Sequence, residues 1–161
     1  MLSLFEPGNE AAWLASFRFG VEVRPRYCEC DGQGHVSNVV YAEYLELSRL
    51  QFFATAGDPE PGDFAFQHVT AELQLRYLAA CNYDEPLRVL SRLSALGRSS
   101  ATLEQAIVGA GASLRATARV ALVRSNGSVS LPWTTGQREA LRAVYETGAA
   151  FRGGGAPCGS A

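Results

Sequence analysis

The chain has 161 residues, a net charge of −2, and 47% hydrophobic against 19% charged residues. This length predicts one domain with a buried core, and the composition is that of a globular rather than a disordered protein. The small net charge gives no reason to expect nucleic acid or an anionic membrane as partner, and the absence of lysine excludes a Schiff-base lysine and the phosphate-binding lysine of a P-loop.

The chain ends and the apolar runs bear on localisation and on domain boundaries. Every apolar run is far shorter than the roughly 20 residues that span a bilayer. Residues 1–10 contain no basic side chain and carry Glu6, unlike a secretory signal. We therefore expect a cytoplasmic protein with an N-terminal extension (residues 1–16), one domain (17–147) and a flexible Gly- and Ala-rich tail (148–161).

The first half of the domain is predicted as a strand followed by a helix. Apolar and polar residues alternate over residues 17–24, which is typical of a half-buried strand. Ser37 or Asn38 can cap a helix that runs to Ala56, where Gly57 and Pro59 end it. Residues 58–63 are rich in Pro, Gly and Asp and predict a loop.

The second half is predicted as four strands and a terminal helix. Alternation recurs near residues 72–77, 87–93, 101–107 and 114–122, with Arg88 and Arg92 on a polar face. Gly109-Ala-Gly111 and Asn126-Gly127 predict turns, and Thr134-x-x-Gln137 predicts a capping box for a helix that ends near Thr147.

These elements predict an α+β domain. Because no helices separate the later strands, a doubly wound parallel sheet is disfavoured and an antiparallel meander is expected. We expect a curved antiparallel sheet wrapped around one long central helix. The remaining face of the sheet would need a cover, and a homodimer or homotetramer would supply one.

Residues 27–41 carry the strongest functional signal. Asp31 stands between the first predicted strand and the helix start. A helix start offers unpaired N–H groups and positive dipole density. A carboxylate that attacks or activates water, beside donors that hold an oxyanion, suits acyl transfer.

Other sites fit the sequence less well. Gly32-x-Gly34-x-x-Ser37 lacks the third glycine and the βαβ context of a dinucleotide site, and no Gly-x-Ser-x-Gly elbow is present. Cys28 and Cys30 lie two apart on a strand-like segment, but only His35 and His68 could join them as zinc ligands. We expect no metal site and free thiols.

The sequence resembles the hotdog-fold acyl thioesterases, in particular the 4-hydroxybenzoyl-CoA thioesterase and YbgC/FadM-like branch. The resemblance covers about residues 17–145. It rests on Tyr27, Glu29-Cys-Asp31, Gly34-His-Val36, Asn38, Tyr41, Tyr44-Leu-Glu46, Glu72-Leu-Gln-Leu-Arg-Tyr77, Leu96-Gly-Arg-Ser-Ser100 and Leu131-Pro132.

The resemblance implies roles for individual residues. Asp31 corresponds to the catalytic aspartate, as nucleophile or general base, and the amide at or next to Asn38 would polarise the thioester carbonyl. Tyr27 corresponds to an active-site tyrosine of some members, and His35 to a histidine that assists the acid or orients water. Some members have a histidine where this chain has Asn38, so that histidine's role does not transfer.

The implied substrate-binding residues lie in three places along the chain. Gly34, Val36 and Tyr41 belong to the helix-start motif, and Glu46 occupies a position that serves as the catalytic carboxylate in another branch. Arg98, Ser99 and Ser100 could hold a phosphate or pantetheine group.

Each of these residues also has a structural interpretation. Asp31 can brace the following turn, the His35 side chain can bond to backbone carbonyls, and Asn38 can act only as an N-cap. Tyr27 and Tyr41 can serve packing alone. Glu46 can pair with Arg49 on the helix surface, and Arg98 can be an ordinary exposed arginine.

The expected activity is hydrolysis of an acyl thioester carried on coenzyme A or on an acyl carrier protein. No cofactor is expected beyond the coenzyme A or phosphopantetheine of the substrate. Two alternatives stay open: a hotdog hydratase, dehydratase or lyase that acts on enoyl thioesters, and a non-catalytic acyl-thioester binder.

Overall fold

The computed structural model describes residues 8–56 and 68–147. The predicted loop 58–63 and the predicted tail 148–161 lie outside these residues. The helices are α1 (Glu10–Ala15), α2 (Asn38–Ala56) and α3 (Thr135–Thr147), with short 3-10 turns η1 (Tyr27–Glu29) and η2 (Ala110–Ala112). The strands are β1 (Phe19–Val23), β2 (His68–Tyr77), β3 (Leu87–Leu96), β4 (Ser100–Val108) and β5 (Leu114–Arg124). Within the described ranges no helix is long and apolar enough to cross a membrane.

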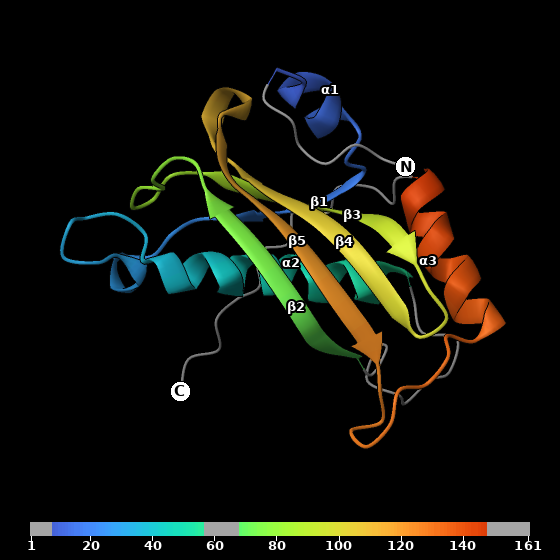
Figure 1. The fold of residues 1–161 in the computed structure, drawn as a ribbon. Helices are drawn as coiled ribbons and strands as arrows, with labels where there is room; N and C mark the ends of the chain where they lie inside the picture. The colour runs from blue at the N-terminus through green and yellow to red at the C-terminus, as the bar shows by residue number, and fades with distance from the viewer. Residues whose placement is uncertain (1–7, 57–67, 148–161) are drawn as a thin grey trace.

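The five strands form one antiparallel sheet in the order β1-β3-β4-β5-β2. The expected α+β class, with a curved sheet on one long helix, is confirmed (Figure 1). The meander holds only for β3, β4 and β5, because β2 pairs with β5 at the far edge rather than with β3. The chain after β2 therefore returns across the sheet before it enters β3.

The inner face of the sheet packs against α2 (Figure 1). Leu45, Phe52 and Phe53 of α2 are fully buried against the inner-face side chains of β4 and β5, such as Leu103 and Val120. Burial of a large apolar side chain contributes about 1.5–3 kcal/mol, so this contact holds α2 on the sheet. The α3 helix closes one end through Leu141 and Val144, which belong to the same core.

The outer face of the sheet, opposite α2, is partly covered by α1. Trp13 of α1 is buried against Leu90, Ala106 and Val108. Arg92 of β3 is buried on this face and forms an ion pair with Glu104 of β4. Arg92 does lie on the face opposite Leu87, Val89 and Leu93, as the alternation predicted, but the docking of α1 covers this part of the outer face and buries it.

The predicted turns and the cap are confirmed. Gly109 and Ser113 close the β4–β5 hairpin through a 2.8 Å backbone bond, and Gly127 has a φ of 92° in the turn after β5. Thr134 and Gln137 exchange side-chain and backbone bonds of 3.1 and 3.2 Å at the start of α3. This reciprocal pattern is a capping box.

The edge strand β2 leaves apolar side chains in contact with solvent. From Val69 to Gln74 every residue of the strand is exposed. Exposed large apolar residues on β2 and on α2 are Val39, Leu47, Leu50, Val69, Leu73 and Tyr77. An edge of this kind is a ready site for pairing with another strand.

Candidate active site

The loop from β1 to α2 folds back on itself and presents Asp31 to solvent. The backbones of Cys30 and Val36 form an isolated antiparallel β-bridge, and the Asp31 amide donates to the His35 carbonyl at 2.8 Å. Gly34 has a φ of 79°, a left-handed conformation that favours glycine. Asp31 therefore lies at the start of a tight turn that precedes the helix.

The Asp31 carboxylate makes one hydrogen bond in this turn. Its Oδ1 accepts from the Gln33 amide at 2.8 Å, which is the turn-bracing arrangement that aspartate often adopts. Its Oδ2 has no hydrogen bond within the described chain. One oxygen thus holds the turn while the other is available to a substrate or a water molecule.

The α2 helix begins at Asn38, which places Ser37 at the N-cap position. The Ser37 amide donates to the Glu29 carbonyl at 2.9 Å, so the loop leads directly into the helix. The amides of Asn38 and Val39 make no hydrogen bond within the described chain, and both residues are exposed. This helix start therefore offers donors to a ligand oxygen.

Glu29 fixes the loop to the helix. Its carboxylate accepts from the Arg26 amide at 2.6 Å, from the Arg26 guanidinium at 2.7 and 3.0 Å, and from the Tyr44 hydroxyl of α2 at 2.8 Å. Burial alone would raise the pKa of Glu29, but the bonds from Arg26 and Tyr44 lower it below its ordinary value. Burial and the bond to Glu29 raise the pKa of Tyr44.

Two tyrosines connect the helix start to the end of β2. The Tyr77 hydroxyl donates to the Asn38 carbonyl at 3.0 Å, and the Tyr41 hydroxyl accepts from the Cys81 amide at 2.9 Å. The two rings meet edge to face with centroids 5.2 Å apart. Burial, chiefly, raises the pKa of Tyr41, so this phenol stays protonated and serves packing and hydrogen bonding.

The remaining residues of the predicted catalytic set, His35 and Tyr27, belong to the same loop. We call this loop together with the start of α2 the Asp31 corner. The His35 side chain is exposed and makes no hydrogen bond within the described chain, while its backbone pairs with Asn82. Tyr27 is 82% exposed in η1 and meets Tyr83 edge to face. Because η1 is helical, Cys28 and Cys30 do not share a strand face as expected.

The structure brings together only part of the predicted substrate-binding set. Gly34 and Val36 belong to the loop, with Val36 buried, and Tyr41 lies one turn into α2. Glu46 is exposed two turns along the helix. It makes no ion pair with Arg49 in the described chain, because Arg49 is buried and donates to Gln105 at 3.1 Å.

Arg98, Ser99 and Ser100 lie at the opposite end of the sheet within one chain. The Ser99 carbonyl accepts from the amide of Arg124, at the end of β5. The segment after β2 that contacts the Asp31 loop is bonded to Arg115, at the start of β5. At about 3.3 Å per residue, these two ends of β5 are roughly 30 Å apart.

Sequence reasoning missed the supporting residues of this corner. Glu29 was noted only as part of the motif, and Tyr77 and Cys81 were not assigned a role at the site. The spacing of Glu29 and Tyr44 carries no periodic signal, since one lies in a loop and the other on a helix. Only the fold shows that their side chains meet.

The described side chains form no group of three or more His, Cys, Asp or Glu residues that could hold a metal ion. The corner instead combines one exposed carboxylate, one exposed imidazole and unpaired helix-start amides. Such a set can take a proton from water and hold an oxyanion.

Comparison with known proteins assigns the family. The family model described as "Thioesterase superfamily" matches residues 33–121, more than half of the chain. An uncharacterised protein of Bacillus subtilis (strain 168), YsmA, is 30% identical over 132 residues, which cover 80% of this chain and 88% of that protein. The family match includes the helix start at Asn38 and begins two residues after Asp31.

Solved structures share the fold. A thioesterase from Thermus thermophilus, complexed with coenzyme A and Zn, has a TM-score of 0.73 at 29% identity, over 81% of this chain and 96% of that one. A 1,4-dihydroxy-2-naphthoyl-CoA thioesterase from Synechocystis has a TM-score of 0.68 at 14% identity, over 77% and 95%, and bears on the fold alone. Sequence and architecture agree, and the chain belongs to the thioesterase superfamily and has its hotdog fold.

Proposed function

We propose that this protein is an acyl-CoA thioesterase of the 4-hydroxybenzoyl-CoA thioesterase and YbgC/FadM-like branch. The observation that carries the proposal is the corner where the exposed Asp31 carboxylate precedes the unpaired amides of Asn38 and Val39. Membership of the superfamily supports hydrolysis of an acyl thioester in general. The order of motif residues from Tyr27 to Glu46 supports the branch.

In the proposed reaction, the thioester carbonyl oxygen rests against the start of α2. One such donor is worth about 3 kcal/mol of transition-state stabilisation in comparable oxyanion holes. Asp31 either removes a proton from the attacking water or attacks the carbonyl carbon itself. When water attacks, the carbon–sulfur bond breaks directly, and the thiolate takes up the proton that Asp31 removed from the water, so the products are a carboxylic acid and a free thiol. When Asp31 attacks, the same bond breaks to release the thiolate, which takes a proton from solvent. The resulting acyl–aspartyl anhydride is then hydrolysed by a water molecule, which releases the carboxylic acid and restores Asp31.

The other residues take supporting roles in this proposal. His35 orients water or assists the acid, and Tyr27 acts as the active-site tyrosine that some members of the family have at this position. Gly34, Val36 and Tyr41 shape the corner, while Glu46 lies farther along α2. Coenzyme A is favoured over an acyl carrier protein because the Thermus thermophilus thioesterase was solved with coenzyme A.

We further propose that the protein acts in the cytoplasm as a homo-oligomer built on β2. The exposed apolar stripe on β2 and α2 needs a cover, and a second β2 can pair with this free edge. In antiparallel pairing, the His68 end of one β2 meets the Tyr77 end of the other. That arrangement would bring Arg98, Ser99 and Ser100 of one copy toward the corner of the other.

The test is a thiol-release assay with a panel of saturated and α,β-unsaturated acyl-CoA substrates. Asp31→Asn should lower kcat by about 10²–10⁴-fold, the usual range for loss of a general base. Asn38→Ala should cost less, because the backbone amide remains. Asp84→Asn is the control, since Asp84 is an exposed aspartate in another turn, where it pairs with Arg24.

The outcomes of this assay distinguish the candidate functions from one another. Wild-type kcat in Asp31→Asn would remove Asp31 from the mechanism. Hydration of the enoyl substrates without thiol release would assign the hydratase alternative. Saturable binding of acyl-CoA with no turnover of any substrate would assign the non-catalytic binder.

A further inference from the structure

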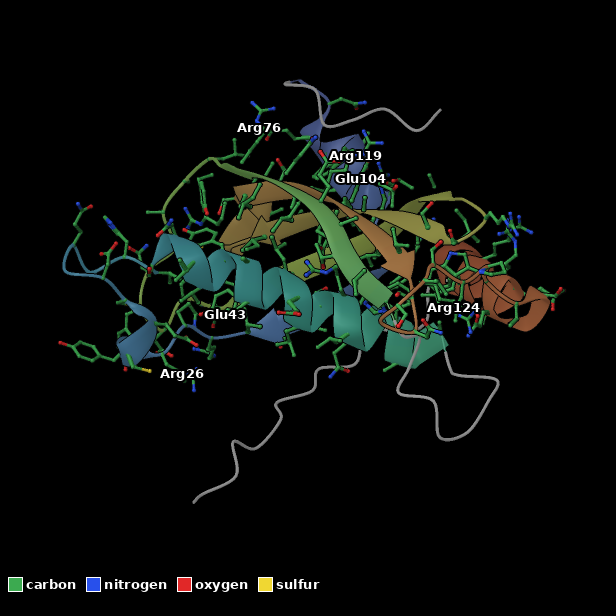
Figure 2. All side chains as sticks on the ribbon, turned by 60° about the horizontal axis from the view of Figure 1, so that its bottom comes forward. Arg26, Glu43, Arg76, Glu104, Arg119 and Arg124 are labelled. Carbon is green, nitrogen blue, oxygen red and sulfur yellow. The ribbon has the colours of Figure 1, made fainter. Side chains whose placement is uncertain are left out.

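A pocket lies on the outer face of the sheet, between α1 and strands β2, β4 and β5. Its volume is about 270 Å³. Figure 2 shows Arg76, Arg119 and Glu104 on the side of the sheet where α1 lies. The residues that line this outer-face pocket are Trp13, Gln74, Arg76, Glu104, Thr117, Ala118 and Arg119.

Strand register places two arginines beside each other in this pocket. Arg119 of β5 lies opposite Gln74 of β2, and Thr117 of β5 lies opposite Arg76. Arg76 and Arg119 are therefore diagonal neighbours on one face, within reach of a shared ligand. Gln74 and Thr117 complete this group of four residues, which consists of two neighbouring cross-strand pairs on one face.

Neither arginine is neutralised by the described chain. Arg76 and Arg119 are exposed, and neither forms an ion pair or a hydrogen bond within residues 8–56 and 68–147. Glu104 lies opposite Arg119 on β4. Its Oε2, however, accepts from Arg92 Nε at 2.9 Å, from Arg92 Nη2 and from Trp13 Nε1 at 3.3 Å.

The pocket is consequently a positive site on an acidic protein. Three arginines, Arg76, Arg92 and Arg119, outnumber the two carboxylates of the neighbourhood, Glu104 and Glu72, and Glu72 is bonded to Gln74 at 2.7 Å. Two guanidinium groups side by side repel each other until an anion lies between them. Planar guanidinium groups match the oxygens of phosphate in a bidentate fashion.

We propose that the outer-face pocket binds a small phosphate-bearing ligand, either inorganic phosphate or a small phosphate monoester. Arg76 and Arg119 hold the oxygens, and Thr117 and Gln74 supply neutral donors. The volume lies just below the roughly 300–1,000 Å³ of most small-molecule sites, so the ligand is small. Trp13 comes from the N-terminal extension, outside the residues that the family model matches, and the site is separate from the Asp31 corner.

Proton–nitrogen correlation spectra of the full chain test this proposal. The protein has two tryptophans, so it gives two indole N–H signals. The Trp13 indole donates to Glu104 at the pocket wall, whereas the Trp133 indole donates to the Ser100 carbonyl at 3.1 Å, at the end of the sheet near Arg124. Inorganic phosphate and glycerol 1-phosphate are the two probes, and acetate and sodium chloride at matched ionic strength are the counter-probes.

The expected result is a saturable shift of the Trp13 signal with at least one phosphate probe, while the Trp133 signal stays in place. A response to both probes, or to one, identifies which form of phosphate the pocket takes. Arg76→Gln and Arg119→Gln should each weaken the binding about tenfold or more, because each removes charge-assisted bonds. Arg142→Gln on α3 removes the same charge from an exposed position elsewhere and should bind as the wild type does.

Other results of these experiments would contradict the proposal. Absence of a saturable shift with both phosphate probes overturns the proposal. So does an equal shift with sodium chloride, or unchanged affinity in both Arg76→Gln and Arg119→Gln. Binding of acetate as tight as that of phosphate overturns the assignment of the ligand class. An unmoved Trp133 signal in each variant confirms that the fold is retained.

Discussion

At the scale of single residues, Glu29 is the residue that joins the Asp31 loop to α2. Its carboxylate is only 10% exposed and receives bonds from both Arg26 and Tyr44. Charge-assisted bonds of this kind are stronger than neutral ones. The geometry of the corner therefore depends on a carboxylate whose bonds go to Arg26 and Tyr44.

Glu29→Gln should lower the free energy of unfolding by about 1–3 kcal/mol, the usual contribution of hydrogen bonds to a charged group. Tyr44→Phe, which removes one of these bonds, should cost about 1 kcal/mol. Urea denaturation measures both losses. Glu22→Gln on the exposed side of β1 is the matched control and should change little. A loss in Glu22→Gln as large as that in Glu29→Gln would remove the special role of Glu29.

The contribution of Glu29 should also depend on pH. Its pKa in the folded protein lies below the ordinary value of 4.5. The stabilisation is then complete above pH 4.5 and is lost as the pH falls through the folded pKa. The stability difference between the wild type and Glu29→Gln should shrink on acidification below pH 4.5. A difference that grows on acidification would contradict the lowered pKa.

At the scale of elements, a buried polar network lies between α2 and the sheet. Gln105 of β4 donates to the Leu45 carbonyl at 2.9 Å and to Ser91 at 2.8 Å, and accepts from Arg49 at 3.1 Å. Ser91 also bonds to Ser48 at 2.7 Å. Burial lowers the pKa of Arg49, and the charge of Glu46 partly offsets this effect.

Gln105→Ala should destabilise the protein far more than Ser91→Ala. The first change leaves the buried Arg49 cation without its acceptor, which costs about 3–5 kcal/mol when a buried charge loses its partner. The second costs about 1 kcal/mol, because Ser48 keeps the Val89 carbonyl and Gln105 keeps the Leu45 carbonyl. Denaturant unfolding compares the two, and the double change Arg49→Met with Gln105→Leu should recover much of the loss. Equal losses in the single variants would show that Arg49 reaches water.

At the scale of the whole molecule, the exposed face of β2 is the feature that a single chain leaves incomplete. Val69 and Leu73 are 52% and 36% exposed on this strand. Lysines on edge strands prevent strand pairing. The double substitution Val69→Lys with Leu73→Lys should therefore convert the proposed oligomer to a monomer in sedimentation equilibrium. Val129→Lys, in the turn after β5, should leave the mass unchanged. A monomeric wild-type protein would overturn the proposed assembly.

Local patterns predicted much of the fold. The strand before the Asp31 loop, the helix ending at Ala56, the Gly109 hairpin and the Thr134 capping box each depend on neighbouring residues, and each lies where the sequence indicated. The sequence did not predict which of those elements pair with one another. Nothing in the alternation of β2 says that it pairs with β5, because pairing depends on which edge is free once the helix is in place.

The sequence by itself determined that a carboxylate precedes a helix start in an α+β domain, because strand period, capping and turn chemistry are properties of adjacent residues. Only the tertiary structure decided that Arg92 and Arg49 are buried, that Glu29 meets Tyr44, and that Arg76 and Arg119 share a pocket. These facts depend on strand register and on the docking of α1 and α2. Contacts between residues that are far apart in the sequence leave no periodic signature in the chain.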